Sequence, residues 1–324
     1  MAPHKKEIVV EVPHRISGFF EIVDEMNGIK IENPEIIGSR GAGFNLSAVG
    51  RTKIQVEKSN TPEINIFINN LKVNRKAETT HYIYNYIKKF LKKVVKINIY
   101  HNFDLPVGCG YGASGAGALG TIYGLDHVLN LNWSNIEKGK IAHIAEVVNH
   151  TGLGTICGQL SGGLCILREP GYPCISERIN FPKNLKVICG TFGMIHTKSV
   201  LTHPKLNLKI KKAGRKAQKM LVQNPNIISF IRASIEFVKE TEILRILNLP
   251  ELEDLIDTLN NLDILGASMN QLGKSVYSIC KLEAVKKVEE VFDSYKPEIQ
   301  VFDLSINKAG PRMINNKNFN PYRS

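Results

Sequence analysis

A glycine-rich segment, Pro106–Gly117, constrains this chain more than any other part of its sequence. Glycine allows the backbone to approach a ligand closely and to adopt positive φ angles. The segment leads into Ser114–Leu129, which we expect to be a helix. The first N–H groups of a helix have no intrahelical partners, and they carry a partial positive charge of about half a unit. Together these features predict an anion site that suits a polyphosphate.

The same segment has a rival interpretation, because Gly110–Gly115 fits the dinucleotide fingerprint G-x-G-x-x-G. That fingerprint requires a strand that runs directly into the turn and an acid about 20 residues later, at the end of a second strand. Pro106 interrupts the approach, and the nearest acid, Asp126, falls inside the expected helix. The pattern therefore argues against a dehydrogenase.

Two further alternatives concern the same chemistry. Gly273-Lys274-Ser275 is similar to the end of a Walker A loop, but Ser268 stands where the first glycine is required. The glycine segment could also be a tight turn without a ligand. The unbroken run of small residues from Gly112 to Ala118 favours a ligand site instead.

Length and composition set the general class of the protein. The chain has 324 residues, 43% of them hydrophobic, which is typical of two domains with substantial cores. No apolar run reaches the roughly 20 residues that span a bilayer, and the N-terminus lacks the apolar core of a signal peptide. We therefore expect a cytoplasmic protein with no membrane partner. The six cysteines form no C-x-x-C pair, so we expect buried reduced thiols rather than disulfides or a zinc site.

The formal net charge is +12, from 42 basic and 30 acidic residues. Such a charge attracts either nucleic acid or small anions such as nucleotides and carboxylates. The densest basic run, Lys88–Lys93, suits a solvated helix face, and no nucleic-acid motif accompanies it. We expect a small-molecule substrate and no nucleic acid. A basic nucleic-acid-binding protein without catalysis stays as the alternative from another class.

The pattern of elements predicts an α+β protein of two lobes. Glu169–Pro173 is the expected boundary between a domain at 1–170 and one at 171–324. Short β-branched runs predict strands in both halves. These are Glu7–Val12, Thr52–Glu57, Ile64–Ile68, Val95–His101, Gly163–Leu167, Lys186–Thr191, Ser275–Cys280 and Glu298–Leu304. Expected helical stretches are Thr79–Lys93, Ser114–Leu129, Asn135–Val148, Lys211–Gln271 and Leu282–Ser294. The third begins with a capping box, Ser134 to Glu137.

The phosphate segment also resembles a known family. Its pattern Pro106-x-x-x-Gly110-x-Gly112-x-Ser114-Gly115-Ala116 is similar to the second motif of the GHMP kinases, P-x-x-x-G-L-G-S-S-A, with Tyr111 in place of leucine. Other blocks resemble the archaeal pantoate kinase branch of that superfamily. They are Pro13–Phe20, Gly38–Leu46, Thr151–Gly154, Ser161–Gly163, Thr197–Leu201 and Ala267–Gly273.

This resemblance implies a fold and an activity. The fold is the two-lobed GHMP kinase fold, with a ribosomal-protein-S5-like N-terminal lobe that binds ATP and a ferredoxin-like C-terminal lobe. The activity is ATP-dependent phosphorylation of (R)-pantoate for coenzyme A synthesis, with Mg²⁺ as cofactor; homodimers are common among such kinases. Another small hydroxy acid or alcohol, such as homoserine or mevalonate, is the alternative substrate.

The resemblance also assigns roles to individual residues. For ATP it implies Pro106, Gly110, Gly112, Ala113, Ser114, Gly115 and Ala116. Ser114 and Glu146 would hold Mg²⁺, which prefers hard oxygen ligands. Ser39, Arg40, His143 and Arg168 would bind the substrate, and the guanidinium fork of Arg168 matches a carboxylate. Ser114, Glu146 and Arg168 are the expected catalytic residues.

His143, Glu146 and His150 lie at helical spacing, but they do not form the zinc signature H-E-x-x-H. One departure from the family concerns the aspartate that many GHMP kinases carry after the glutamate helix. Thr155 stands there. Either the enzyme works without a protein base, as homoserine kinases do, or a carboxylate from elsewhere, such as Asp24, reaches the site.

Overall fold

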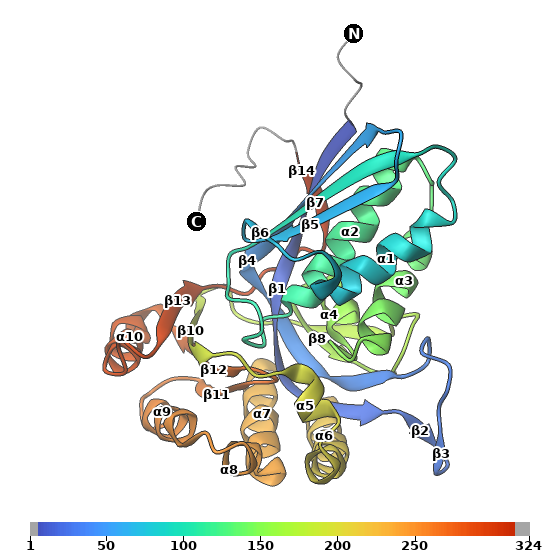
Figure 1. Cartoon of the computed structure of the whole chain (residues 1–324). Helices are drawn as coiled ribbons and strands as arrows, with labels where there is room; N and C mark the ends of the chain where they lie inside the picture. Colours follow the sequence, from blue (N-terminus) through green and yellow to red (C-terminus); the bar gives the residue numbers. More distant parts are fainter. Residues whose placement is uncertain (1–5, 315–324) are drawn as a thin grey trace.

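The computed structural model describes residues 6–314. It contains two main sheets, each covered by helices, and Figure 1 shows them in an upper and a lower lobe. Among the described residues, no helix is both long and apolar enough to cross a membrane. The predicted α+β class is confirmed.

The first lobe is built on an eight-stranded sheet with the order β14-β1-β4-β7-β5-β6, to which β8 and β9 attach through β4. Its elements are β1 (Lys6–Val23), β2 (Glu25–Met26), β3 (Ile29–Lys30), β4 (Gly38–Lys58), β5 (Glu63–Ile68), β6 (Leu71–Lys72), η1 (Asn74–Lys76), α1 (Glu78–Lys88), β7 (Val95–Phe103), α2 (Ala113–Leu129), α3 (Asn135–Val148), α4 (Thr155–Ser161), β8 (Leu164–Leu167), β9 (Ser176–Ile179) and β14 (Arg312–Ile314).

The second lobe is built on an antiparallel sheet with the order β11-β12-β10-β13. Its elements are β10 (Leu185–Gly193), α5 (Thr197–Leu201), α6 (Pro204–Gln223), α7 (Ile227–Thr241), α8 (Ile243–Ile246), α9 (Pro250–Asn260), β11 (Gly266–Asn270), β12 (Lys274–Lys281), η2 (Leu282–Ala284), α10 (Val285–Asp293) and β13 (Gln300–Leu304). Strands β9 and β14 lie beyond residue 170, yet they complete the sheet of the first lobe.

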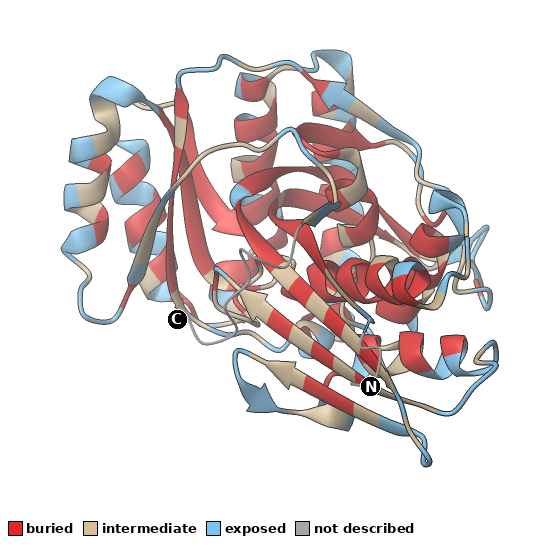
Figure 2. Cartoon of the chain, turned by 90° about the horizontal axis from the view of Figure 1, so that it is seen from above, coloured by how far each residue is buried: buried red, intermediate tan, exposed pale blue. Residues whose placement is uncertain are grey.

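Strands β1 and β4 are much longer than the sequence predicts, and they connect the two lobes. They pair antiparallel from Lys6 and Val56 to Val23 and Gly38. Their far ends pack against the second lobe: the ring of Phe44 on β4 lies 5.6 Å from that of Tyr277 and 5.8 Å from that of Phe230. One continuous hydrophobic core therefore includes residues of both lobes, as the buried interior in Figure 2 illustrates.

Helix α2 lies directly on β4 because glycines face the strand. A Cβ atom on Gly120 would lie 2.2 Å from Thr52 Oγ1, and one on Gly124 would lie 2.5 Å from Ile54 Cγ1. The small residues that follow the glycine segment therefore allow the helix to pack closely on the sheet, whether or not a ligand binds nearby. This contact fixes where the first turn of α2 stands.

The expectation of reduced thiols throughout is wrong. Cys157 on α4 forms a disulfide with Cys174, in the segment before β9. Cys109, Cys165, Cys189 and Cys280 are free and buried, as expected. No local pattern indicates this pair, because the two cysteines are 17 residues apart and come together only where β8 returns the chain beside α4.

Candidate active site

The glycine segment forms an open loop at the first turn of α2. Gly108, Gly110 and Gly112 have φ angles of 80°, 84° and 69°, and Gly112 is the residue that precedes the helix. These are left-handed conformations that glycine adopts at little cost. The loop, together with Ser114, lines a cleft of about 470 Å³ between the lobes. The cleft also has Lys76, Lys198 and the start of α1 in its wall, so it suits an anionic ligand.

The loop is held in place by polar side chains from distant segments. Gln159 on α4 donates from Nε2 to the carbonyl oxygens of Gly112, at 3.0 Å, and Pro13, at 2.9 Å. The backbone N–H of Arg15 donates to Tyr111 O at 3.0 Å. These contacts fix the loop in position before a ligand arrives.

His14 contacts the same loop near both of its ends. Its Nδ1 lies 2.9 Å from Tyr111 O, and its Nε2 lies 3.4 Å from the backbone N of Leu105. The first contact requires a proton on Nδ1, and the second requires a free lone pair on Nε2, so the neutral imidazole satisfies both. Burial lowers the pKa of His14 to about 4, which keeps the ring neutral at ordinary pH.

Glu146 on α3 is a buried carboxylate with one oxygen lacking a donor. Its Oε1 accepts from Ser114 Oγ at 2.6 Å and from Thr151 Oγ1 at 2.9 Å. Its Oε2 is buried without a hydrogen-bond partner among the described residues. Burial raises the pKa of Glu146, and the hydroxyls of Ser114, Thr151 and Thr155 oppose that shift. An orphaned carboxylate oxygen beside a hydroxyl and a phosphate-type loop fits a cation that prefers oxygen ligands.

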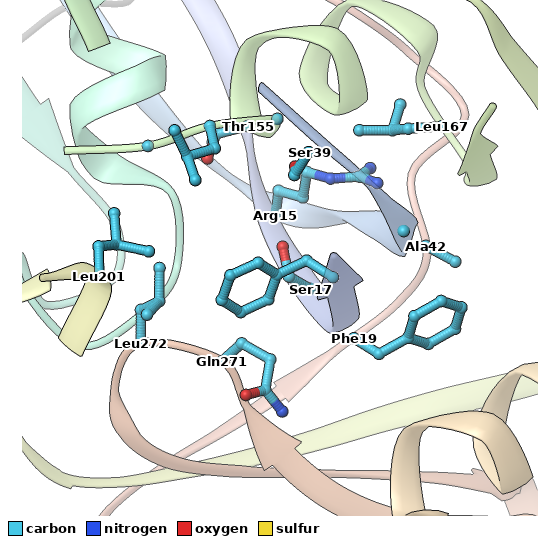
Figure 3. Close-up of a pocket in the computed structure, with 15 residues that line it drawn as sticks. Arg15, Ser17, Phe19, Ser39, Ala42, Thr155, Leu167, Leu201, Gln271 and Leu272 are labelled. Atoms are coloured by element: carbon cyan, nitrogen blue, oxygen red, sulfur yellow. The ribbon is translucent and has the colours of Figure 1, made fainter. Parts of the chain in front are cut away.

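A second, smaller pocket adjoins the cleft and is shown in Figure 3. The two share five lining residues: Arg15, Ser17, Thr155, Gln271 and Leu272. Much of the smaller pocket is apolar, with Phe19, Phe20, Ala42, Leu153, Leu167 and Leu201 in its wall. Its polar members are the hydroxyls of Ser17, Ser39 and Thr155, the amide of Gln271 and the guanidinium of Arg15. A small molecule bound here would lie next to the glycine loop.

The structure brings some of the expected substrate residues to this pocket and leaves others outside it. Ser39 lines it. Arg40 forms an ion pair with Glu21 and does not line either pocket. His143 is buried, and its Nε2 lies 2.9 Å from the carbonyl oxygen of Ile37, two residues before Ser39. His143 therefore does not line the pocket itself but contacts the backbone that leads to Ser39.

Arg168 follows β8 and forms an ion pair with Glu177 on β9. It is absent from the described lining of both pockets. The pairing arises because β8 and β9 form an antiparallel hairpin that places the two side chains together. The role of Arg168 in binding a carboxylate stays a prediction from the resemblance.

No carboxylate takes the place of the missing aspartate in the described lining of the smaller pocket, and in the cleft only Glu78 carries one. Thr155, at the aspartate position, lines both pockets. Asp24, the alternative, forms an ion pair with Lys211 at 2.6 Å and lines neither. The geometry favours the interpretation in which no protein base is used.

Sequence reasoning missed three residues that shape the site: His14, Arg15 and Gln159. His14 and Arg15 lie within the quoted block Pro13–Phe20, and they are its only titratable side chains, a signal that could have identified them. Gln159 offered no such signal, because a glutamine in a short helix is ordinary. Its role depends on contacts with residues far away in the sequence.

Comparisons with known proteins agree with this geometry. Residues 81–163 match the family model described as GHMP kinases N terminal domain, a range that contains both the glycine loop and Glu146. A solved structure titled "Phosphotransferase related to CoA biosynthesis pathway" superposes with a TM-score of 0.83 at 25% identity, covering 95% of this chain and 98% of that one. The homoserine kinase of Cytophaga hutchinsonii, at 18% identity and a TM-score of 0.67 over 97% of this chain and 99% of that one, shares the fold. The fold and site define an ATP-dependent small-molecule kinase of the GHMP class.

Curated relatives identify the branch. The chain is 32% identical to the pantoate kinase of Methanocaldococcus jannaschii over 274 residues, 85% of this chain and 93% of the relative. It is 30% identical to the pantoate kinase of Thermococcus kodakarensis over 86% of this chain and 90% of that relative. The chain belongs to the pantoate kinase family. The resemblance and the GHMP kinase fold expected from the motifs are confirmed.

Proposed function

We propose that this protein transfers the terminal phosphoryl group of ATP to the primary hydroxyl of (R)-pantoate, giving (R)-4-phosphopantoate for coenzyme A synthesis. The observation that carries the proposal is the junction of the two pockets. A polyphosphate on the glycine loop and a small acceptor among Ser17, Ser39 and the apolar residues would meet at Thr155. Pantoate has a carboxylate, two hydroxyls and a quaternary carbon with two methyl groups. The smaller pocket offers a guanidinium, serine hydroxyls and an apolar wall.

The lining also bears on the alternative substrates. Homoserine carries an ammonium group, and a buried ammonium requires an acidic or carbonyl partner. The described lining of the smaller pocket contains no aspartate or glutamate. The apolar wall suits the methyl groups of pantoate better than it suits an ammonium.

We also propose that Ser114 and Glu146 hold Mg²⁺ together with phosphate oxygens and water. The support is the unpartnered Oε2 of Glu146 and the 2.6 Å contact between Ser114 Oγ and Oε1. No group of three histidine, cysteine or acidic side chains among residues 6–314 could hold a metal ion by itself. This fits a Mg²⁺ that uses one or two protein ligands and the nucleotide. The bound ion would neutralise charge on the phosphates during transfer.

The chain's own contribution is then positioning and charge. The amides at the start of α2 bind the phosphates, and Ser17 and Ser39 orient the acceptor hydroxyls. Because no described carboxylate lines the smaller pocket, we propose that the acceptor's hydroxyl proton leaves late, to the transferred phosphoryl group. Phosphoryl transfer tolerates this, since most of its catalysis is positioning and electrostatic stabilisation.

The direct test is an ADP-release assay with pantoate, homoserine, mevalonate and shikimate as acceptors. We expect kcat/KM for pantoate to exceed that for each of the others by at least about 100-fold, because unmatched polar groups in a buried site are costly. Identification of the phosphorylated carbon by ³¹P–¹H NMR completes the test. Equal turnover of homoserine and pantoate would contradict the assignment of the acceptor.

A pH experiment tests the state of Glu146. Burial raises the pKa of this carboxyl in the free protein. As the pH falls, Glu146 is therefore protonated earlier than an exposed glutamate would be. Mg²⁺ competes with that proton, so we expect the acidic limb of the kcat/KM profile to move to lower pH as Mg²⁺ is increased. The effect of this raised pKa on folding stability has the opposite pH dependence to that of a salt-bridged acid, whose pKa is lowered. The nucleotide-free protein loses stability as pH rises through the raised pKa, and thermal unfolding against pH measures this.

Two other expectations accompany this proposal. A cytoplasmic location suits an enzyme that consumes ATP, and a homodimer is common among such kinases. Both stay predictions from the sequence and its resemblance. Fractionation and light scattering would test them.

A further inference from the structure

Ser275, near the start of β12, contacts the glycine loop from the second lobe. Its Oγ lies 2.8 Å from the carbonyl oxygen of Cys109. Cys109 is the residue between Gly108 and Gly110, which both line the cleft. Side chains of the first lobe hold a different part of the loop, such as the carbonyl group of Gly112. Ser275 therefore joins the loop to the sheet of the second lobe.

The Ser275 hydroxyl is oriented by Thr191 on the neighbouring strand β10. The two hydroxyl oxygens lie 2.8 Å apart, and the two residues are partners in the antiparallel register. A serine hydroxyl has one proton and a carbonyl oxygen can only accept. The Ser275 proton therefore goes to Cys109, and the Thr191 hydroxyl donates to Ser275 Oγ. The carbonyl oxygens of Lys274 and Gly193 are farther from Thr191 Oγ1, at 3.3 and 3.4 Å.

The chain of hydrogen bonds continues to a second wall of the cleft. Thr191 Oγ1 accepts from the backbone N–H of Gly193 at 3.2 Å. Gly193 leads into residues 195–198, which line the cleft from the second lobe. The backbone N–H of Ile195 also donates to the carbonyl oxygen of Gly108 at 3.1 Å. The glycine loop and this segment are thus joined directly and through the two hydroxyls, whose hydrogen bonds polarise one another because they run in one direction.

These polar side chains are buried in the core of the second lobe. Ser275 is 0% exposed and Thr191 is 3% exposed. Asn270 on β11 is the register partner of Ser275 on its other side, and it is also buried. A Cβ atom on Gly110 would lie 3.1 Å from Asn270 Nδ2. Three neighbouring strands therefore place a buried polar row against the glycine loop. Because burying polar groups is costly unless they are hydrogen-bonded, contact with the loop explains this row better than core packing does.

We propose that Ser275, oriented by Thr191, is a positioning residue that fixes the glycine loop in the place where it binds the phosphates of the nucleotide. This inference rests on the proposed function, in which that loop binds ATP. Neither residue belongs to the described lining of the cleft, so both act through the backbone. A peptide unit is planar, so holding the carbonyl oxygen of Cys109 also fixes the orientation of the N–H of Gly110.

The test compares Ser275→Ala with Ser278→Ala. Ser278 lies on the same strand and is equally buried, but it donates to the carbonyl oxygen of Ile188 and not to the loop. Calorimetry with a non-hydrolysable ATP analogue and Mg²⁺ measures the affinity. We expect Ser275→Ala to raise Kd by about 5- to 20-fold, the effect of leaving a buried carbonyl group without its donor. Ser278→Ala should keep Kd within about twofold, even where its unfolding temperature falls as much.

Variants of Thr191 test the chain of hydrogen bonds. Thr191→Val removes the hydroxyl with little change of shape, and we expect it to raise Kd by about two- to fivefold. Thr191→Ser keeps the hydroxyl and should restore most of the affinity that Thr191→Val loses. Because both hydroxyls act in one chain, the double variant with Ser275→Ala should bind within about twofold of Ser275→Ala alone. Circular dichroism and the unfolding temperature are recorded for every variant.

Hydrogen exchange of the amides of residues 107–112 in the nucleotide-free protein tests the positioning separately from the proposed function. Ser275→Ala should speed this exchange by about 5- to 20-fold, whereas Ser278→Ala should not. An unchanged Kd in Ser275→Ala would overturn the proposal, and so would equal losses of affinity in the two alanine variants. If the wild type binds no ATP analogue, the proposed function fails, and exchange in the loop still decides whether Ser275 holds it.

Discussion

Replacing Glu146 by glutamine is expected to lower kcat by about 10²- to 10³-fold, which is the usual effect of removing one preorganised electrostatic group from a transition state. The substitution keeps the size of the side chain and the acceptor for Ser114 Oγ and Thr151 Oγ1. What it removes is the negative charge beside the unpartnered Oε2. Steady-state kinetics at several Mg²⁺ concentrations measure the effect, and the apparent affinity for Mg²⁺ should fall with kcat.

Glu137→Gln is the matched control, because Glu137 is an exposed glutamate in the first turn of the same helix, where it is part of the capping box. Glutamine also serves in a capping box, so this variant should keep its activity within about twofold. A Glu146→Gln enzyme with normal kcat and an unchanged Mg²⁺ titration would remove this carboxylate from the reaction.

Replacing Gly273 by alanine is expected to raise KM for ATP by about 10- to 100-fold, since overpacking a close contact costs about 1–3 kcal/mol. Gly273 lies in the turn between β11 and β12, far in sequence from the glycine loop. A Cβ atom there would lie 2.0 Å from the carbonyl oxygen of Cys109 and 2.7 Å from the backbone N of Gly110. Backbone cannot move aside as a flexible side chain can, so the loop must shift away from the position in which we propose that it binds phosphate.

Gly117→Ala provides the control for adding a methyl group near the same helix. A Cβ atom at Gly117 would meet its nearest atom, Cε1 of His101, at 3.5 Å, which is an ordinary contact. Alanine also favours a helix by up to about 1 kcal/mol over glycine. We expect this variant to bind ATP normally and to unfold at the same or a higher temperature. Isothermal calorimetry with a non-hydrolysable ATP analogue compares the two, and normal affinity in Gly273→Ala would contradict the proposed contact.

Local signals predicted much of the fold. Helix α3 has the predicted bounds, Asn135–Val148, because its capping box at Ser134 and Glu137 is a local contact between residues three apart. Helix α2 begins within one residue of its expected start, at the glycine that precedes it. By contrast, β11 lies inside a stretch that was expected to be helical, since five buried residues give no alternating pattern.

The site was predictable only where its chemistry is local. Motifs indicate the glycine loop, Ser114 and Glu146. In the structure Ser114 lies in the cleft that this loop lines and donates a hydrogen bond to Glu146, while the roles of these residues in binding ATP and Mg²⁺ stay predictions. The hairpin that pairs Arg168 with Glu177 is a non-local contact, and neither partner alone shows it in the sequence. The place of Arg15 in the lining of both pockets is also non-local, because it depends on the contact between β1 and the glycine loop.

The two long strands, β1 and β4, have a consequence for how the molecule can be divided. Because their distal halves supply Phe19 and Phe44 to a core shared with α7 and β12, a fragment ending near residue 170 would expose that apolar surface to water. It would also lose β14, which pairs with the edge of β1 opposite β4. The N-terminal half of the chain should therefore not fold on its own. We expect thermal unfolding of the whole polypeptide to be one cooperative transition and not two.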